Sequence, residues 1–225
     1  MAVIHKTTMK PTKLELLTPW LPLQPWYLGA GRDPELSRVG GFRLDDPRGE
    51  VGIEFMVVRD DSGERPVHYH LPLSYRGAPL DGAEQGLIGT SEHGVLGQRW
   101  IYDGAHDPVL VAQLLALLQG RAAAQMQSES DTPDPSVTVD RAEAIPAGSS
   151  GAPEVTDGPD ITNGSDGTRL AVGPLTLDVT RVLRPGEDGR AAAALAHVSA
   201  GWRLPDGGEA RGRFAVLSDA VSRAS

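Results

Sequence analysis

Apolar and polar residues alternate along residues 42–77 in a way that predicts three antiparallel strands. Two short segments, 45–49 and 60–64, interrupt the apolar runs with Asp, Pro, Ser and Gly, the residue types that form tight turns. In the middle run, apolar side chains occupy every second position: Val51, Ile53, Phe55 and Val57. This period of two is typical of a β-strand, so the stretch predicts a meander with one apolar and one mixed face.

A helix is predicted at residues 108–118 as the cover for the apolar face. Asp107 is a suitable N-cap, Pro108 fits the first helical position, and Gly120 is a stop signal. Between them, leucine and valine recur at helical spacing. A strand is predicted directly before this helix, at 97–103, and a short helix is expected around 14–17. Strands followed by a helix laid on them indicate an α+β fold.

Two further segments make up the rest of the chain. Residues 122–167 contain no aromatic residue and are dominated by Pro, Ser, Gly, Asp, Glu and Thr, which predicts an acidic, disordered linker or insertion. Apolar alternation resumes at Leu170 and includes a hairpin across 205–208. These strands are too few to be stable alone, so we expect them to complete the first sheet. The predicted organisation is a domain at 1–121, a linker at 122–168, sheet-completing strands at 169–218 and a tail at 219–225.

The amino-acid composition disfavours a protein that binds nucleic acid or a membrane. The net charge is −9, but residues 121–168 carry nine acidic and two basic residues, so the rest of the chain is almost neutral. Strong attraction to nucleic acid or to anionic lipid needs clustered Lys and Arg, and neither partner is expected. The chain has no cysteine, and charges and prolines interrupt its first thirty residues before any membrane span or signal core develops. We therefore expect a cytoplasmic protein.

The sequence contains no recognisable motif for binding a nucleotide or transferring its phosphate. Phosphate-binding folds rely on a lysine in a specific context, whereas the three lysines, Lys6, Lys10 and Lys13, all precede the first predicted strand. No G-x-x-x-x-G-K-[ST] motif occurs, and the glycines between 86 and 97 lack a strand–loop–helix context. No cofactor is predicted.

Histidines and carboxylates were the remaining candidates for chemistry. His68 and His70 share one face of a predicted strand, a spacing that suits two metal ligands, but no third ligand follows, and the favoured interpretation is a solvent-facing pair without metal. His93 and His106 are expected in loops, with His106 solvated. The carboxylates that flank strands, Glu50, Glu54 and Asp103, are interpreted as surface or turn residues. A pair for glycoside hydrolysis stays an open alternative, because its separation is purely spatial.

Aromatic residues gather near the start of the chain, at Trp20, Trp26 and Tyr27. Such rings mostly serve the core, so the favoured interpretation is that they plug the end of the sheet. The alternative is an exposed docking patch for a partner.

Three motifs resemble the N-terminal cap region of bacterial maltokinases. They are WLPLQPWY at 20–27, PLSYR at 72–76 and HGVLGQRWIYD at 93–103. The resemblance covers about residues 14–120, although Pro25 and Ala30 replace the basic residues usual in that family. It implies a cystatin-like curved antiparallel sheet packed by one main helix, in a cap that precedes the kinase lobes and supplies no catalytic, cofactor-binding or metal-binding residue.

The resemblance therefore implies a non-catalytic module rather than an enzyme. The expected role is an accessory or regulatory protein, with a partner among enzymes of trehalose, maltose or α-glucan (glycogen) metabolism. The alternative is a protein that binds an α-glucan or small sugar, or acts on a glucan, with the ligand stacked on Trp20, Trp26, Trp100 or Trp202.

Overall fold

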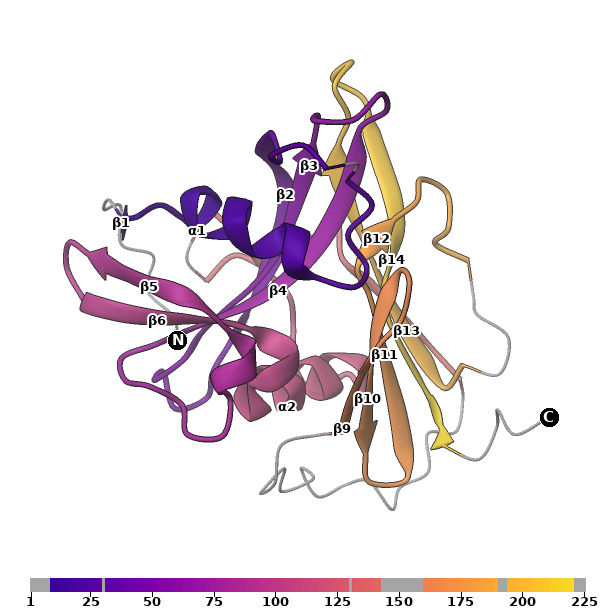
Figure 1. Cartoon of the computed structure of the whole chain (residues 1–225). Coiled ribbons are helices and arrows are strands. Elements are labelled where there is room, and N and C mark those ends of the chain that lie inside the picture. The colour runs from indigo at the N-terminus through magenta and orange to yellow at the C-terminus, as the bar shows by residue number, and fades with distance from the viewer. Residues whose placement is uncertain (1–8, 30, 130, 143–159, 190–193, 221–225) are drawn as a thin grey trace.

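The computed structural model describes residues 9–29, 31–129, 131–142, 160–189 and 194–220. Its helical elements are α1 (Lys13–Trp20), η1 (Leu21–Leu23), η2 (Glu84–Gly86), η3 (Gly104–His106) and α2 (Pro108–Leu118). The strands are β1 (Met9–Lys10), β2 (Leu36–Asp45), β3 (Gly52–Asp60), β4 (Val67–Arg76), β5 (Leu87–His93), β6 (Gly97–Asp103), β7 (Gln125–Met126), β8 (Thr138–Arg141), β9 (Asp160–Asn163), β10 (Gly167–Val172), β11 (Leu175–Thr180), β12 (Val182–Leu183), β13 (Ala196–Arg203) and β14 (Glu209–Asp219). The fold is α+β and mostly antiparallel sheet (Figure 1).

The predicted meander is confirmed as β2, β3 and β4. Phe42 pairs with Phe55 across the first hairpin, and Val57 pairs with His70 across the second. The turns fall where Asp, Pro and Gly cluster, because these residues supply the backbone angles that a tight turn requires. The C-terminal hairpin is also as predicted, with β13 and β14 joined across 204–208.

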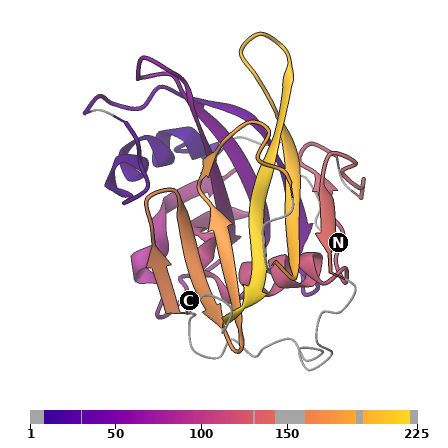
Figure 2. The same cartoon turned by 90° about the vertical axis from the view of Figure 1, so that its right-hand side faces the viewer.

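The sheet closes on itself. Its strand order is β1-β5-β6-β4-β3-β2-β13-β14-β11-β10-β9, and β12, which follows β11, pairs with β4. Leu183 pairs with His68 and Val182 with Tyr69, and the His70 amide donates to the Arg181 carbonyl at 2.8 Å. Strands β4, β3, β2, β13, β14 and β11–β12 thus form a ring, whose C-terminal strands face the viewer in Figure 2.

Both faces of the central strands are buried, which differs from the prediction of one apolar and one mixed face. Inside the ring, Phe55 and Val57 pack in a core that also contains α2 and the C-terminal strands. On the outer face, Met56 and Val58 pack against α1, η1 and Trp26. The mixed face therefore has a cover of its own, supplied by the segment that precedes the meander in sequence.

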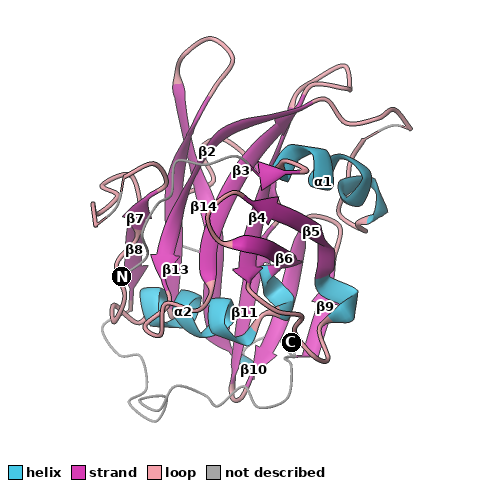
Figure 3. Ribbon diagram, turned by 90° about the vertical axis from the view of Figure 1, so that its left-hand side faces the viewer, coloured by secondary structure: helices cyan, strands magenta, loops and turns pink. Residues whose placement is uncertain are grey.

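Helix α2 begins and ends as predicted and crosses one end of the ring (Figure 3). The Asp107 side chain accepts from the Val109 amide at 2.9 Å and also binds Arg76 of β4 through two hydrogen bonds of 2.6 and 2.7 Å. The helix ends before Gly120, whose φ of 75° suits a residue without Cβ. One aspartate thus caps the helix and fixes it to the meander.

The described parts of the range predicted to be a disordered linker contain three short strands instead. Within 122–142 and 160–168, strands β7, β8 and β9 pair with β2, β13 and β10, respectively. Strands of two to four residues are too short to show periodicity, which is why the sequence did not reveal them. Residues 143–159 of the predicted linker, residues 221–225 of the tail and Lys6 lie outside the described residues.

Candidate functional site

A cleft of about 450 Å³ lies on the outer face of the meander, beside α1 and the β5–β6 hairpin. The elements that line it are β1, α1, β2, β3 and the turn between them, β4, the β5–β6 hairpin and the segment after β7. The residues that line it are Met9, Lys13, Arg38, Arg43, Leu44, Asp46, Gly49, Glu50, Val51, Gly52, Ile53, Glu54, Tyr75, His93, Leu96, Arg99 and Gln127. This volume lies within the roughly 300–1,000 Å³ range of small-molecule sites.

Glu54 is the central polar group of this cleft. It is 5% exposed, and one carboxylate oxygen, Oε2, accepts from both Lys13 Nζ and Tyr75 Oη at 2.5 Å. Its other oxygen, Oε1, accepts from Gln127 Nε2 at 3.0 Å. The Lys13 ammonium also lies 4.9 Å from the centroid of the Tyr75 ring. Donors from three separate segments, α1, β4 and the residues after β7, therefore converge on one carboxylate of β3.

The environment of Glu54 keeps it ionised. Burial by itself would raise its pKa, but the charge and hydrogen bond of Lys13, together with the Tyr75 hydroxyl, lower the pKa below its ordinary value. Burial and the adjacent Glu54 carboxylate raise the pKa of Tyr75 well above its ordinary value, so the phenol keeps its proton. A carboxylate with a lowered pKa and three donors is suited to binding and poorly suited to acting as a general acid.

Three arginines add positive charge to the same cleft. Arg43 lies directly across from Glu54 in the β2–β3 register, and its Nε donates to the Met126 carbonyl at 3.1 Å. Arg99, from β6, donates from Nη2 to the Leu96 carbonyl at 2.8 Å. Arg38 is exposed on β2, and its charge helps to lower the pKa of Glu54.

The prediction of a surface or turn residue was wrong for Glu54. Glu50 is exposed as expected and Asp103 caps the η3 turn, but Glu54 and Asp103 are only 5% and 6% exposed. Leu73 of β4 pairs with both and so lies between them. Asp46, the other buried carboxylate of the cleft, accepts from the amides of its own turn at 2.9–3.1 Å. Glu50 is thus the exposed carboxylate among the described residues that line this cleft. Glu54 itself is held by three donors, which disfavours its use as one of a catalytic pair in glycoside hydrolysis.

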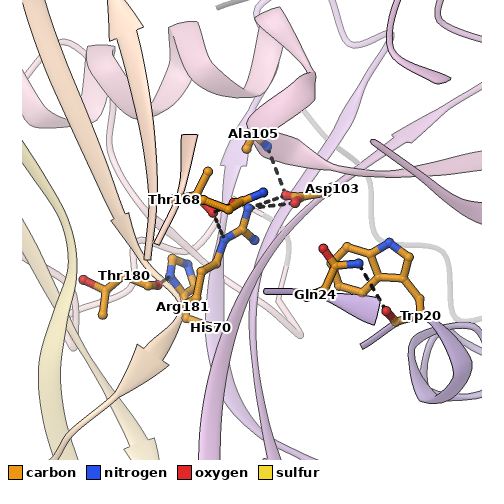
Figure 4. Close-up of polar contacts among 9 residues, drawn as sticks. Trp20, Gln24, His70, Asp103, Ala105, Thr168, Thr180 and Arg181 are labelled. Carbon is orange, nitrogen blue, oxygen red and sulfur yellow. Dashed lines mark hydrogen bonds and ion pairs between the residues drawn. The ribbon is translucent and has the colours of Figure 1, made fainter. Parts of the chain in front are cut away.

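Asp103 belongs to a second buried polar cluster, which joins the C-terminal strands to β6 (Figure 4). Arg181, at 0% exposure, donates from Nη2 to both Asp103 oxygens at 2.7 Å and from Nε to Thr168 Oγ1 at 2.8 Å. Its guanidinium carbon lies 5.1 Å from the Trp26 ring. Because every group here is enclosed by protein, we interpret this cluster as a structural link.

The prediction of solvent-facing histidines was wrong. His68 is 7% exposed and His70 is 0% exposed, because both point into the ring. His70 Nδ1 donates to the Thr180 carbonyl at 2.8 Å, and its ring lies 4.4 Å from that of Phe214. His106 is half-buried rather than solvated, and His93 ends β5 instead of lying in a loop. Among the described residues, no group of three His, Cys, Asp or Glu could hold a metal ion.

Burial of His70 predicts a loss of stability in mild acid. Burial lowers the pKa of His70 to about 3, against an ordinary value of about 6.5, so the folded protein holds this imidazole neutral. Below about pH 6.5 the unfolded chain gains a proton that the folded chain does not, and stability falls by about 1.4 kcal/mol per pH unit until about pH 3. We therefore expect the titration of His70 to lower the free energy of unfolding by about 2 kcal/mol by pH 5, as measured by urea unfolding.

The His70→Leu variant is the comparison for this measurement, because leucine does not titrate. Its stability should decline less steeply with falling pH, and a residual slope should remain, since burial also lowers the pKa values of His68 and His106. Identical slopes in the two proteins between pH 7 and 5 would contradict the assignment.

The aromatic residues mainly serve the core. Trp26 is fully buried on the outer face of β3 and β4, and its ring lies 5.9 Å from both Trp20 and Tyr69. Trp202 is 2% exposed inside the ring, while Trp20 and Trp100 are half-buried. The rings therefore cover a face of the sheet rather than its end. The buried pair, Trp26 and Trp202, cannot offer a stacking surface to a sugar.

Two leucines of this segment are exposed, unlike its tryptophans. Leu23 is 77% exposed and Leu28 is 54% exposed.

No described helix is long and apolar enough to cross a membrane.

Comparison with known protein families finds a match for one part of the chain. The family model of the maltokinase N-terminal cap domain matches residues 20–107. The match begins at the last residue of α1 and ends at the N-cap of α2, so it contains the whole meander and the β5–β6 hairpin. Lys13 and Gln127, which both bind Glu54, lie outside it. No curated protein matches the chain.

Proposed function

Because residues 20–107 match the maltokinase N-terminal cap domain, we propose that this chain is a non-catalytic accessory module that acts on an enzyme of trehalose, maltose or α-glucan metabolism. The cap is a non-catalytic part of the maltokinases. The proposal extends that property to the whole chain and adds a protein partner. It treats residues 1–121 as the cystatin-like cap and 169–218 as strands that complete its sheet, in a cytoplasmic protein.

The observation that carries the non-catalytic role is the state of the buried ionisable groups. Glu54 is held by Lys13 and Tyr75, Asp103 by Arg181, and Asp107 by Arg76. General acid–base catalysis requires a group whose pKa lies near the working pH and which can reach a substrate. These carboxylates are ion-paired and fixed, which favours a structural or binding role over catalysis.

The exposed leucines favour a protein partner. Leu23 and Leu28 flank Pro25 in the segment that follows α1, so apolar side chains project from the cap close to the buried Trp26. Exposed apolar side chains that lie close together in one segment can supply the apolar part of a protein contact surface. In maltokinases the cap is joined to kinase lobes, so an enzyme of the same metabolism is the partner we propose.

Binding to purified enzymes tests this proposal. We expect the immobilised protein to capture at least one purified maltokinase, trehalose-converting or α-glucan-synthesising enzyme, and to show no phosphotransfer from ATP to maltose on its own. Leu23→Asp should weaken capture at least tenfold, because a charge would be placed in an apolar contact. Leu87→Asp is the matched control, since Leu87 is an exposed leucine on β5. Absence of capture with all enzymes, or phosphotransfer by the protein alone, would overturn the proposal.

A further inference from the structure

We propose that the Glu54 cleft binds a small hydroxylated anion, of the class of phosphorylated monosaccharides. Arg43 and Arg99 would bind the anionic group, and the Glu54 carboxylate would accept a hydrogen bond from a ligand hydroxyl. This site is independent of the protein partner proposed above, and it can be tested without one.

The balance of charge in the cleft favours an anion. Lys13 and Glu54 neutralise each other, and Asp46 is occupied by the amides of its turn. The remaining cations are three guanidinium groups, from Arg38, Arg43 and Arg99, against one exposed carboxylate, that of Glu50. The chain as a whole carries −9, so a local excess of guanidinium groups is contrary to its overall charge. That overall charge also disfavours a long polyanion as the ligand.

Unpartnered donors strengthen the argument. Nη2 of Arg43 and Nε of Arg99 are both buried and, like Nη1 of Arg181 in the second cluster, have no hydrogen-bond acceptor among the described residues. Buried guanidinium donors are almost always paired, because an unpaired one loses its hydration without compensation. Both side chains are already anchored through another nitrogen, to the carbonyls of Met126 and Leu96. Each side chain is therefore held in place at the cleft while one of its donors lacks an acceptor, and a phosphate or carboxylate in the cleft would supply one.

Glu54 adds a site for a neutral hydroxyl. A carboxylate offers about four lone-pair positions, and three are used by Lys13, Tyr75 and Gln127. The remaining position accepts a hydroxyl hydrogen but repels a second anion. A ligand that carries an anionic group at one end and hydroxyls at the other satisfies both parts of the cleft, whereas inorganic phosphate satisfies the arginines alone.

Two of the residues that hold Glu54 lie outside the range matched by the family model. Lys13 comes from α1 and Gln127 follows β7, both outside residues 20–107. They bind different oxygens of the Glu54 carboxylate, and Arg43 is anchored to the carbonyl of Met126, the residue before Gln127. The segment after α2 thus completes the cleft, so the site belongs to the whole fold.

Calorimetric titration of the full chain at low salt tests the proposal. The probes are glucose 1-phosphate, glucose 6-phosphate and glucuronate, with glucose and inorganic phosphate as the two half-ligands. We expect at least one hydroxylated anion to bind at least tenfold more tightly than either half-ligand. Phosphate binding as tightly as the sugar phosphates would show an adventitious ion only and would overturn the proposal, as would the absence of heat with all three anions.

Matched arginine variants locate the site. Arg43→Gln and Arg99→Gln should each weaken binding about tenfold, because each removes a charged donor. Arg169→Gln is the control: Arg169 is an exposed arginine of β10 that pairs with Asp178, away from the cleft. Arg99→Gln leaves the contact between Arg43 and Met126 intact, so it stays informative if Arg43→Gln fails to fold. Equal affinity in Arg99→Gln and the parent protein would overturn the assignment to this cleft.

Discussion

Replacing Arg181 by Met is expected to lower the free energy of unfolding by about 3–5 kcal/mol. Arg181 is fully buried and makes two hydrogen bonds of 2.7 Å to Asp103, which is itself 6% exposed. Methionine retains most of the apolar volume but leaves the carboxylate with one weaker donor, the Ala105 amide at 3.2 Å. An uncompensated buried charge is far more costly than the net contribution of the ion pair itself.

Urea unfolding of matched variants checks this expectation. Arg169→Met removes the exposed partner of Asp178, a pair whose side chains are 50% and 24% exposed, and should cost less than about 1 kcal/mol. The double variant Arg181→Met, Asp103→Leu should recover part of the stability lost in the single variant, because it removes the stranded charge. A single-variant loss no larger than that of Arg169→Met would show that the buried pair does not link the two parts of the sheet.

The sequence predicted those elements whose signals are local. The period of two in β3 and the Asp107-Pro108 start of α2 depend on residues that are neighbours in the chain, and both were confirmed. The strands β7 and β8 were missed because two to four residues carry no recognisable period. Their positions are set by hydrogen bonds to β2 and β13, which are distant in sequence.

The candidate site could not be predicted for a different reason. A glutamate at an alternating position of a strand indicates the polar face of that strand. The pattern is the same whether that face is exposed to water or packs against a lysine ammonium group. Glu54 is 41 residues from Lys13 and 73 residues from Gln127, so no local pattern connects the three. Likewise, Asp103 and Arg181 are 78 residues apart. Burial of these carboxylates follows from tertiary pairing, which a single sequence does not reveal.

The family match covers a shorter part of the chain than the sheet to which it belongs. The match ends at residue 107, yet the β4 strand within it pairs with β12 at residues 182–183, and its His70 amide donates to the Arg181 carbonyl. In a chain that had the cap alone, this edge of β4 would need another partner, because unpaired strand edges attract other chains. Here the C-terminal strands provide that partner and also enclose His68 and His70. The matched region is therefore expected to depend on the later strands for its stability.

Phe214→Ala tests that dependence directly. Phe214 is fully buried on β14, and its ring lies 4.4 Å from His70 of β4 and 5.9 Å from Phe42 of β2. Truncation to alanine leaves a cavity between the two parts of the sheet and should cost about 3–5 kcal/mol. Leu23→Ala is the control: its side chain is 77% exposed, so it should change stability by less than about 0.5 kcal/mol.

Hydrogen exchange shows where that stability is lost. If the ring unfolds as one unit, the amides of β3 and β4 should lose protection to the same extent as those of β13 and β14, because the global opening is the same event for both. Exchange that increases in β13 and β14 while β3 and β4 keep their protection would mean that the matched cap is stable without the later strands. In that case the contacts of His70 with Phe214 and Thr180 would be packing between two units rather than the core of one.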